Sequence, residues 1–376
     1  MQTVVRTNGS MGVCCNIQSN VNVRTTNIYD FWNSDYINSF QQNILEGNKI
    51  KECENCYKSE ELSGSSMRTK TLVDYKFFSE KTYIKLMDYY GYTNRKFPVR
   101  VEFHCGNLCN LKCLTCNPAD SSAFLSEDKV LKITNYDQRN FSIDDDLLQN
   151  NINLCMKHEV DLLDLRGGES MLVPKVKRTL IDLPEHLCRN KTIRVQTNGT
   201  ILDDTWKTIF QKFKVIEIML SIDAYDTANT YIRYPADWSK IETSLEYFKS
   251  LSNCKLYINC TVSNLNFIIL SDLLSWADRK NVYIHTSILT SPNYYKYTNM
   301  PSLLYEEAKN KLLPWLSKPQ YSNLEKVIAA EPDDTKWKEF CKIITARDRY
   351  RNNNIFDIIP QFKEYWQCQD KITKVI

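Results

Sequence analysis

The sequence predicts an α/β protein whose largest part is a partial (β/α)6 barrel. Three observations carry this prediction: the length of the chain, its composition, and the alternation of short apolar runs with helical patterns. At 376 residues, the chain suits one large α/β domain with appended elements. Hydrophobic residues make up 43% and charged residues 25%, which is the composition of an ordinary globular protein.

The pattern divides the chain into three parts. Residues 1–97 are rich in loops and contain two cysteine pairs, with one amphipathic period at Ile37–Leu45. Residues 98–290 carry the alternation of strands and helices. Residues 291–376 begin with two prolines, Pro292 and Pro301, that signal the exit from the barrel. We expect this last part to be mainly helical, because four apolar residues recur there at helical spacing: Leu304, Ala308, Leu312 and Leu316.

Each element of the barrel has its own signal in the sequence. Short apolar runs indicate six strands: Val99–Phe103, Asp161–Leu165, Thr192–Gln196, Val215–Ile222, Lys255–Val262 and Val282–Ser287. Amphipathic patterns between them indicate five helices: Ser122–Ile133, Pro174–Cys188, Asp203–Phe213, Trp238–Leu251 and Phe267–Arg279. Strands that alternate with helices form a parallel sheet, and six such units suit a partial barrel. The active site of a barrel is built at the carboxyl ends of its strands.

Charge and hydropathy exclude some classes of partner. The net charge is +3, from 48 basic and 45 acidic residues, so we expect no binding of nucleic acid or of a membrane surface. No apolar run has the length of a membrane span, and Met1 is followed by no charged-then-apolar leader. We therefore expect a cytoplasmic protein. Its 14 cysteines are then expected to bind metal or to take part in catalysis rather than to form disulfides.

Three cysteines form a C-x3-C-x2-C array directly after the first barrel strand. They are Cys109, Cys113 and Cys116. Such short spacings bring soft thiolates together on one loop, which is what an iron–sulfur cluster needs. Three ligands leave one iron open to a small molecule, so we predict a [4Fe–4S] cluster here. The alternatives are three unrelated buried cysteines, or a zinc site that lacks its fourth ligand.

This segment, Phe103–Cys116, resembles the cluster loop of the radical S-adenosylmethionine (SAM) superfamily. The resemblance implies a radical SAM barrel in which the open iron chelates SAM. It also implies an oxidoreductase supplied with electrons by an external flavodoxin or ferredoxin type donor. Reductive cleavage of SAM would give a 5′-deoxyadenosyl radical that abstracts hydrogen from a substrate.

A second match follows the second strand. Gly167, Gly168 and Glu169 resemble the GGE motif of the superfamily, whose backbone and carboxylate receive the SAM ammonium. Glycines let a backbone approach a ligand closely, and an acidic side chain pairs with an ammonium group. A plain tight turn is the alternative for this segment.

Further matches lie after the third and fourth strands. Asn198 ends the third strand, as in many members of the superfamily, and Ser221 and Asp223 end the fourth. Arg233 follows, and in related enzymes a serine and an arginine at such places meet the SAM ribose and carboxylate. Asp223 is equally suited to cap a helix, and Arg233 to be a surface charge.

The amino-terminal part contains a second group of cysteines: Cys14, Cys15, Cys53 and Cys56. It resembles the auxiliary-cluster modules called SPASM and twitch, and one family with many viral members carries a similar element before the barrel. The host cytoplasm would then be the location. We predict a second [4Fe–4S] cluster or a zinc ion here. Several ligand sets remain open: three protein ligands, both Cys14 and Cys15, a contribution from Cys105, or a degenerate module.

The resemblance favours a peptide or protein as the substrate. Dehydrogenation or epimerisation of a small molecule is the second reading. A non-catalytic protein stabilised by iron–sulfur or zinc is the third. No catalytic acid or base can be assigned among the four histidines, and we interpret the remaining single cysteines as small buried hydrophobic residues: Cys155, Cys188, Cys254, Cys260, Cys341 and Cys368.

Overall fold

A computed structural model describes most of the chain. The described residues are 2–17, 19–63, 66, 68–69, 96–133 and 145–366. Two sets of predictions lie outside them: those for residues 70–95 of the amino-terminal part, and those for residues 367–376, which include Cys368.

The protein has an α/β fold around one open sheet in the strand order β2-β1-β3-β4-β5-β6-β7-β8. All six predicted barrel strands are confirmed, and they run parallel in sequence order. Their bounds are β3 Arg100–His104, β4 Leu162–Arg166, β5 Thr192–Thr197, β6 Val215–Ser221, β7 Cys254–Val262 and β8 Tyr283–Ile288. The carboxyl ends of these strands therefore meet at one rim.

The start of the chain adds two strands that the sequence pattern does not predict. Strand β1 (Gln2–Val5) lies parallel to β3, and β2 (Met11–Gly12) pairs with β1 in the antiparallel direction. Such short strands have too few residues to show a period. The amino-terminal part thus extends the barrel sheet, and the proposed division at residue 97 stays a prediction.

The helices follow the predicted order, with one correction. The single helix predicted over Pro174–Cys188 is two helices, α8 (Pro174–Asp182) and α9 (Glu185–Cys188), because Pro184 disfavours a helical conformation at Leu183. The other predicted helices are α6 Ser122–Leu131, α10 Asp204–Gln211, α12 Trp238–Ser250 and α13 Leu270–Lys280. Helices that were not predicted are α1 Ile28–Trp32, α3 Glu54–Ser63, α7 Asp145–Lys157 and α11 Thr227–Ile232. Helix α2 (Asp35–Leu45) contains the predicted amphipathic period.

The carboxyl-terminal extension is helical over its described residues, as predicted. It contains α14 Ser302–Leu312, α15 Glu325–Ile328 and α16 Trp337–Arg351, with 3-10 turns between and after them. Leu304, Ala308 and Leu312 are buried, whereas Leu316 lies beyond the end of α14 in a 3-10 turn that contains Pro314. None of the helices in the described ranges is both long and apolar enough to span a membrane.

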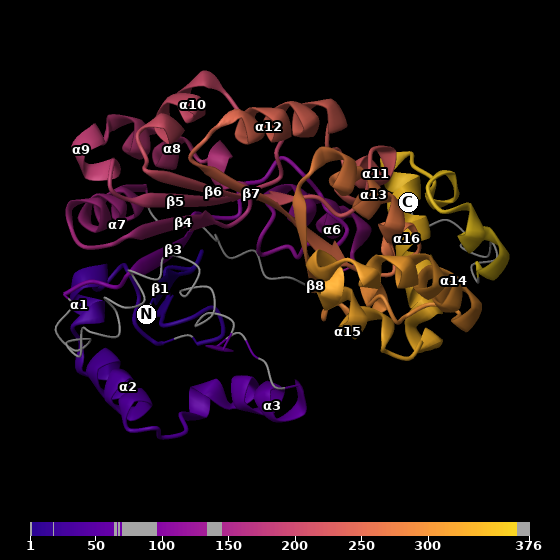
Figure 1. The fold of residues 1–376 in the computed structure, drawn as a ribbon, viewed down its shortest axis with the longest axis horizontal. Helices are drawn as coiled ribbons and strands as arrows, with labels where there is room; N and C mark the ends of the chain where they lie inside the picture. Colours follow the sequence, from indigo (N-terminus) through magenta and orange to yellow (C-terminus); the bar gives the residue numbers. More distant parts are fainter. Residues whose placement is uncertain are drawn as a thin grey trace.

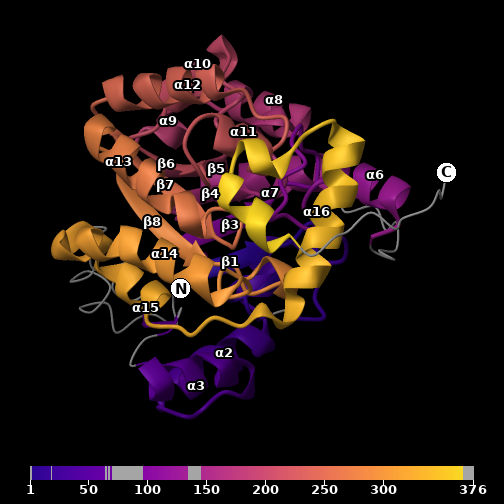
Figure 2. The ribbon, with the colours of Figure 1, turned by 90° about the vertical axis from the view of Figure 1, so that its right-hand side faces the viewer.

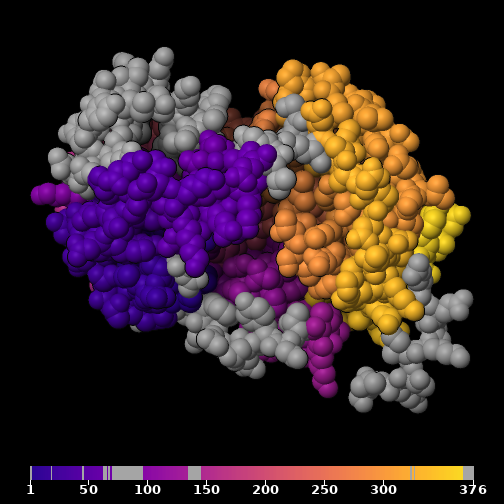
Figure 3. Space-filling view, turned by 90° about the horizontal axis from the view of Figure 1, so that it is seen from below, coloured from indigo at the N-terminus to yellow at the C-terminus, as the bar shows by residue number. Residues whose placement is uncertain are grey.

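The elements form layers on the two faces of the sheet. Helices α8, α10 and α12 cover one face, and the amino-terminal part and the carboxyl-terminal extension lie across the other (Figures 1 and 2). Viewed from that second side, these two parts stand apart and flank a hollow (Figure 3). The hollow lies on the side of the sheet opposite helices α8, α10 and α12.

Candidate active site at the cysteine loop

The loop of residues 105–121, which we call the cysteine loop, connects β3 to α6 at the carboxyl end of the sheet. Cys113 is buried, and Cys109 and Cys116 are partly buried. Burial raises the pKa of Cys109, and the nearby Cys113 adds to the rise, so that the pKa is about 11. Burial also raises the pKa of Cys116, with Cys113 and Cys109 adding to the effect. The structure therefore gathers the three predicted thiols within electrostatic range of one another.

The glycine pair after β4 lies against the backbone of this loop. Gly168 N–H donates to the Gly106 carbonyl and Glu169 N–H donates to the Leu108 carbonyl, both at 2.8 Å. A Cβ atom on Gly167 would lie 2.6 Å from the Gly106 carbonyl oxygen, and Gly167 has a φ of +119°. The glycines therefore allow the close approach of the cysteine loop itself.

Glu169 is buried at the centre of this contact. Its Oε1 accepts hydrogen bonds from Thr197 Oγ1 at 2.9 Å and from Met171 N–H at 3.3 Å, and its Oε2 accepts one from Asn198 N–H at 2.7 Å. Burial raises the pKa of Glu169 to about 7, although these hydrogen bonds oppose the rise. A cation placed beside it would favour the carboxylate form.

Asn198 connects the end of β5 to the cysteine loop. Its side-chain amide donates to Asn110 Oδ1 at 3.0 Å, and its Oδ1 accepts from Thr200 Oγ1 at 2.6 Å. Asn110 Nδ2 in turn donates to Thr200 Oγ1 at 2.9 Å. Asn110 and Thr197 are residues that sequence reasoning missed, although both lie inside motifs that it singled out.

Asp223 and Arg233 form a buried ion pair between the ends of β6 and α11. Arg233 Nη1 lies 2.8 Å from Asp223 Oδ2, while Asp223 Oδ1 accepts from Thr261 N–H at 2.8 Å. Arg233 Nε is buried and has no hydrogen-bond partner among the described residues. Ser221 is buried at the end of β6. The Asp223 side chain is fully buried, and that of Arg233 is 14% exposed.

Arg233 also places a positive charge beside the thiols of the cysteine loop. Burial lowers the pKa of the Arg233 guanidinium, but the thiols of Cys113 and Cys116, together with Asp223, outweigh it and leave the pKa raised. A guanidinium beside three thiols stabilises negative charge on them.

The donor set of the loop fits an iron–sulfur cluster. No three His, Cys, Asp or Glu side chains in the described ranges converge as they would around one metal ion. A four-iron cluster is larger than a single ion and holds its thiolates further apart. Soft sulfur ligands beside a buried arginine with an unpartnered Nε provide the ligand type and the charge that an anionic cluster needs.

The amino-terminal cysteines lie on two separate segments. Burial raises the pKa of Cys14, and the charges of Cys53 and Cys56 act in the same direction. The residue Cys15 is exposed. Partial burial of its thiol raises its pKa, Cys14 and Glu102 add to the rise, and Arg166 opposes it.

Cys105, a candidate ligand for the amino-terminal site, lies in the hydrophobic core. Its Sγ donates to the Phe103 carbonyl at 3.5 Å, and burial raises its pKa to about 12. Cys105 is the first residue of the cysteine loop, and its N–H donates to the Arg166 carbonyl at the end of β4.

Below the site, the face of the sheet toward the hollow carries a ladder of charges. Arg100 Nη2 lies 2.7 Å from Glu102 and 2.5 Å from Asp164, and Arg194 lies 2.7 Å from Glu217. Burial raises the pKa of Glu102, but His104 and the neighbouring arginines outweigh it and hold the pKa at about 2. Each of these buried carboxylates is therefore paired with an arginine.

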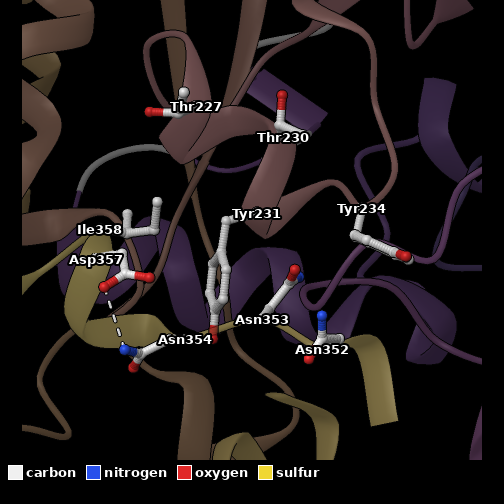
Figure 4. Close-up of a pocket in the computed structure, with 9 residues that line it drawn as sticks. All are labelled: Thr227, Thr230, Tyr231, Tyr234, Asn352, Asn353, Asn354, Asp357 and Ile358. Atoms are coloured by element: carbon white, nitrogen blue, oxygen red, sulfur yellow. Dashed lines mark hydrogen bonds between the residues drawn. The ribbon is translucent and has the colours of Figure 1, made fainter. Parts of the chain in front are cut away.

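A separate cavity of about 380 Å³ lies between α11 and the residues after α16 (Figure 4). Its lining is mostly hydroxyl and amide groups, with Asp357 as a carboxylate. None of the predicted site residues lines it, although Tyr234 lies between this cavity and the cysteine loop.

Comparisons with known proteins give similarity to solved structures alone. No protein-family model matches the sequence, and no curated protein matches it. Native anSMEcpe with bound AdoMet is 17% identical, with a TM-score of 0.41, and the match covers 62% of this chain and 63% of that chain. Streptococcus suis SuiB bound to S-adenosylmethionine is 15% identical, with a TM-score of 0.42 over 71% of this chain and 60% of that chain. The chain thus spans about three fifths of the length of these two proteins.

Proposed function

We propose that the protein is a radical SAM enzyme whose [4Fe–4S] cluster is held by Cys109, Cys113 and Cys116. The observation that carries the proposal is the grouping of these thiols at the carboxyl end of the sheet, beside buried Arg233 and Glu169. A structural metal site needs thiolates alone. It has no use for a buried carboxylate after β4 and a largely buried guanidinium at the end of α11.

The residues of the chain have distinct parts in this proposal. When bound, the cluster supplies the electron that cleaves SAM to a 5′-deoxyadenosyl radical. The thiols give up their protons on binding iron, and Arg233 stabilises the resulting negative charge.

The SAM molecule is held by the strand ends in this proposal. Glu169 accepts the ammonium group, with Gly167 and Gly168 as the backbone beside it. Arg233 would bind the carboxylate and Ser221 the ribose, and Asp223 orients Arg233 through their ion pair at 2.8 Å. Asn198 fixes the cysteine loop against β5 through Asn110.

A second metal centre is proposed for Cys14, Cys53 and Cys56, with Cys15 as a further ligand. These cysteines lie on two segments that one bound metal centre would connect. Thiolates suit either a second [4Fe–4S] cluster or zinc. We further propose a peptide or protein substrate, an external flavodoxin or ferredoxin type electron donor, and a cytoplasmic location. The substrate proposal rests on the resemblance of the amino-terminal part to auxiliary-cluster modules.

Anaerobic reconstitution with iron and sulfide tests the proposed function. We expect about four irons per chain at the cysteine loop, and release of 5′-deoxyadenosine from SAM after reduction. Bound iron without any cleavage of SAM would favour the non-catalytic iron–sulfur protein. A protein that takes up no iron at the cysteine loop would contradict the proposal itself.

A further inference from the structure

The carboxyl-terminal helix α16 carries two buried arginines, Arg347 and Arg351, that pair with helix α6. Arg347 contacts Glu127 Oε1 and Asp128 Oδ1 of α6, each at 2.5 Å. Arg351 Nε donates to Glu127 Oε2 at 3.0 Å and its Nη2 to Oε1 at 2.8 Å. The side chains of both arginines are almost inaccessible, with 1% and 2% of their surface exposed. Helix α16 is therefore tied to the helix that follows the cysteine loop.

Arg351 also reaches the cysteine loop itself. Its Nη2 donates at 2.6 Å to the carbonyl of Lys112, which lies between Cys109 and Cys113. On the other side, Lys112 N–H donates to the Tyr234 carbonyl at 2.5 Å. The Arg351 guanidinium stacks over the Tyr234 ring, 4.9 Å from its centroid. Arg351 thus holds the peptide unit after Lys112, and Tyr234 holds the peptide unit before it. Arg351 also contacts Tyr234, so the two contacts support each other.

Arg351 also brings a positive charge to the cysteine loop. The carbonyl to which its Nη2 donates belongs to the peptide bond between Lys112 and Cys113, so the guanidinium lies beside a proposed cluster ligand. The Arg351 side chain lies in the protein interior, where charge interactions are screened least. A positive charge at this place favours the added negative charge of a reduced cluster.

We propose that Arg351 is a positioning residue of the proposed cluster site, which holds the cysteine loop through Lys112 and raises the reduction potential of the cluster. The inference rests on the proposed function. It assigns the carboxyl-terminal extension to the site itself, since the contact joins residues 239 positions apart.

The test compares Arg351→Met and Arg351→Lys with a matched control, Arg347→Met. Arg347 belongs to the same helix and binds the same Glu127, but its ion pairs are to α6 rather than to the loop. The full-length protein is reconstituted without air. The cluster potential and its electron paramagnetic resonance spectrum are then measured, together with thermal melting.

We expect one-electron reduction to become about tenfold less favourable in Arg351→Met, a fall of 59 mV in potential. Arg351→Lys keeps the charge and loses the forked geometry, so its potential should fall less while its spectrum still changes. Arg347→Met should lose as much stability as Arg351→Met and keep the wild-type potential. An unchanged potential in Arg351→Met, or an equal fall in Arg347→Met, would overturn the proposal. If Arg351→Met does not fold, Arg351→Lys decides, and a wild-type spectrum and potential in that variant overturn it.

Hydrogen exchange on the metal-free protein separates this inference from the proposed function. Residues 109–116 should exchange faster in Arg351→Met than in Arg347→Met, because only the first variant loses the Lys112 contact. A wild-type protein that binds no iron would refute the proposed function and the effect on potential, while faster exchange would still support the positioning role. Equal exchange in the two variants would refute that role.

Discussion

The cysteine loop of the barrel and the amino-terminal cysteine group differ in how the chain holds them. The loop takes its three thiols from one short segment whose backbone is bonded to β4, to α11 and to α16. The amino-terminal group takes Cys14 from the turn after β2, Cys53 from a 3-10 turn (Lys51–Cys53) and Cys56 from α3, a helix with no fully buried side chain among those described.

The supports of the second group are correspondingly fewer. Arg6 Nη2 donates to the carbonyls of Cys14 and Cys15, at 3.1 and 2.9 Å, and fixes that turn. Tyr36 lies within electrostatic range of both segments: burial raises its pKa, and the charges of Cys14 and Cys53 act in the same direction. From this comparison we propose that the fold forms the first site in advance, whereas the order of the second depends on what its cysteines bind.

The largest expected effect is the loss of the proposed cluster from the cysteine loop. A variant with Cys109, Cys113 and Cys116 all changed to Ala should lose about four irons and all formation of 5′-deoxyadenosine, because each thiolate is an obligate ligand. Iron analysis and chromatography of the products measure both. Cys155→Ala, which removes a buried thiol of helix α7, is the control and should keep its iron. Cleavage of SAM by the triple variant would refute the central proposal.

The next variant tests the second site. Cys53→Ala/Cys56→Ala should lose about four irons or one zinc, and its melting temperature should fall because the metal stabilises this part. Metal content of protein purified without air distinguishes the two metals. Retention of both metals at wild-type levels would mean that these cysteines are ordinary thiols. The cysteine loop should keep its own iron, about four atoms, whichever metal the amino-terminal cysteines bind.

A smaller effect concerns the buried carboxyl group beside the first site. Folding raises the pKa of Glu169 from its ordinary value of 4.5 to about 7, so the folded state binds the proton more tightly. Its contribution to stability is present below pH 4.5 and is lost as the pH rises to about 7. The loss is about 3 kcal/mol at most. Urea unfolding of the metal-free protein at about pH 5 and about pH 8 should show this fall, and Glu169→Gln should abolish it.

The smallest effect sharpens the comparison at the level of SAM. Glu169→Gln keeps the volume and removes the charge, so SAM affinity should fall by about one to two orders of magnitude, or about 1.5–3 kcal/mol. Thr197→Val is the matched variant, because it removes a hydrogen bond to Glu169 Oε1 and leaves the charge. Calorimetry on the reconstituted protein should give a much smaller loss for it. Equal affinity of Glu169→Gln and the wild type would assign Glu169 to the shape of the turn alone.

The barrel could be predicted from the sequence because its signals are local. Each strand shows its own apolar run, and each cysteine of the loop lies in one motif. Helix α11 was missed because its six residues are too few to show a period. Helix α7 was overlooked although its buried residues, among them Leu148, Ile152 and Cys155, recur at helical spacing. Strand β1 was missed because its pairing partner, β3, lies far along the chain.

The support of the site could not be predicted for the same reason. Gly167 and Gly168 are explained by the loop that packs on them, a contact between two distant segments. Arg351 carries no motif, and only the fold brings it to Lys112. Local pattern therefore finds the groups that do chemistry, and tertiary contacts decide what holds them.

The bond from Arg351 to the Lys112 carbonyl has a consequence for biosynthesis. A ribosome makes the cysteine motif early, and 239 further positions separate Lys112 from the arginine that completes its support. Long-range contacts of this kind form late in folding. The motif is therefore translated well before its final conformation exists, and iron supplied to the nascent chain meets an unfinished loop.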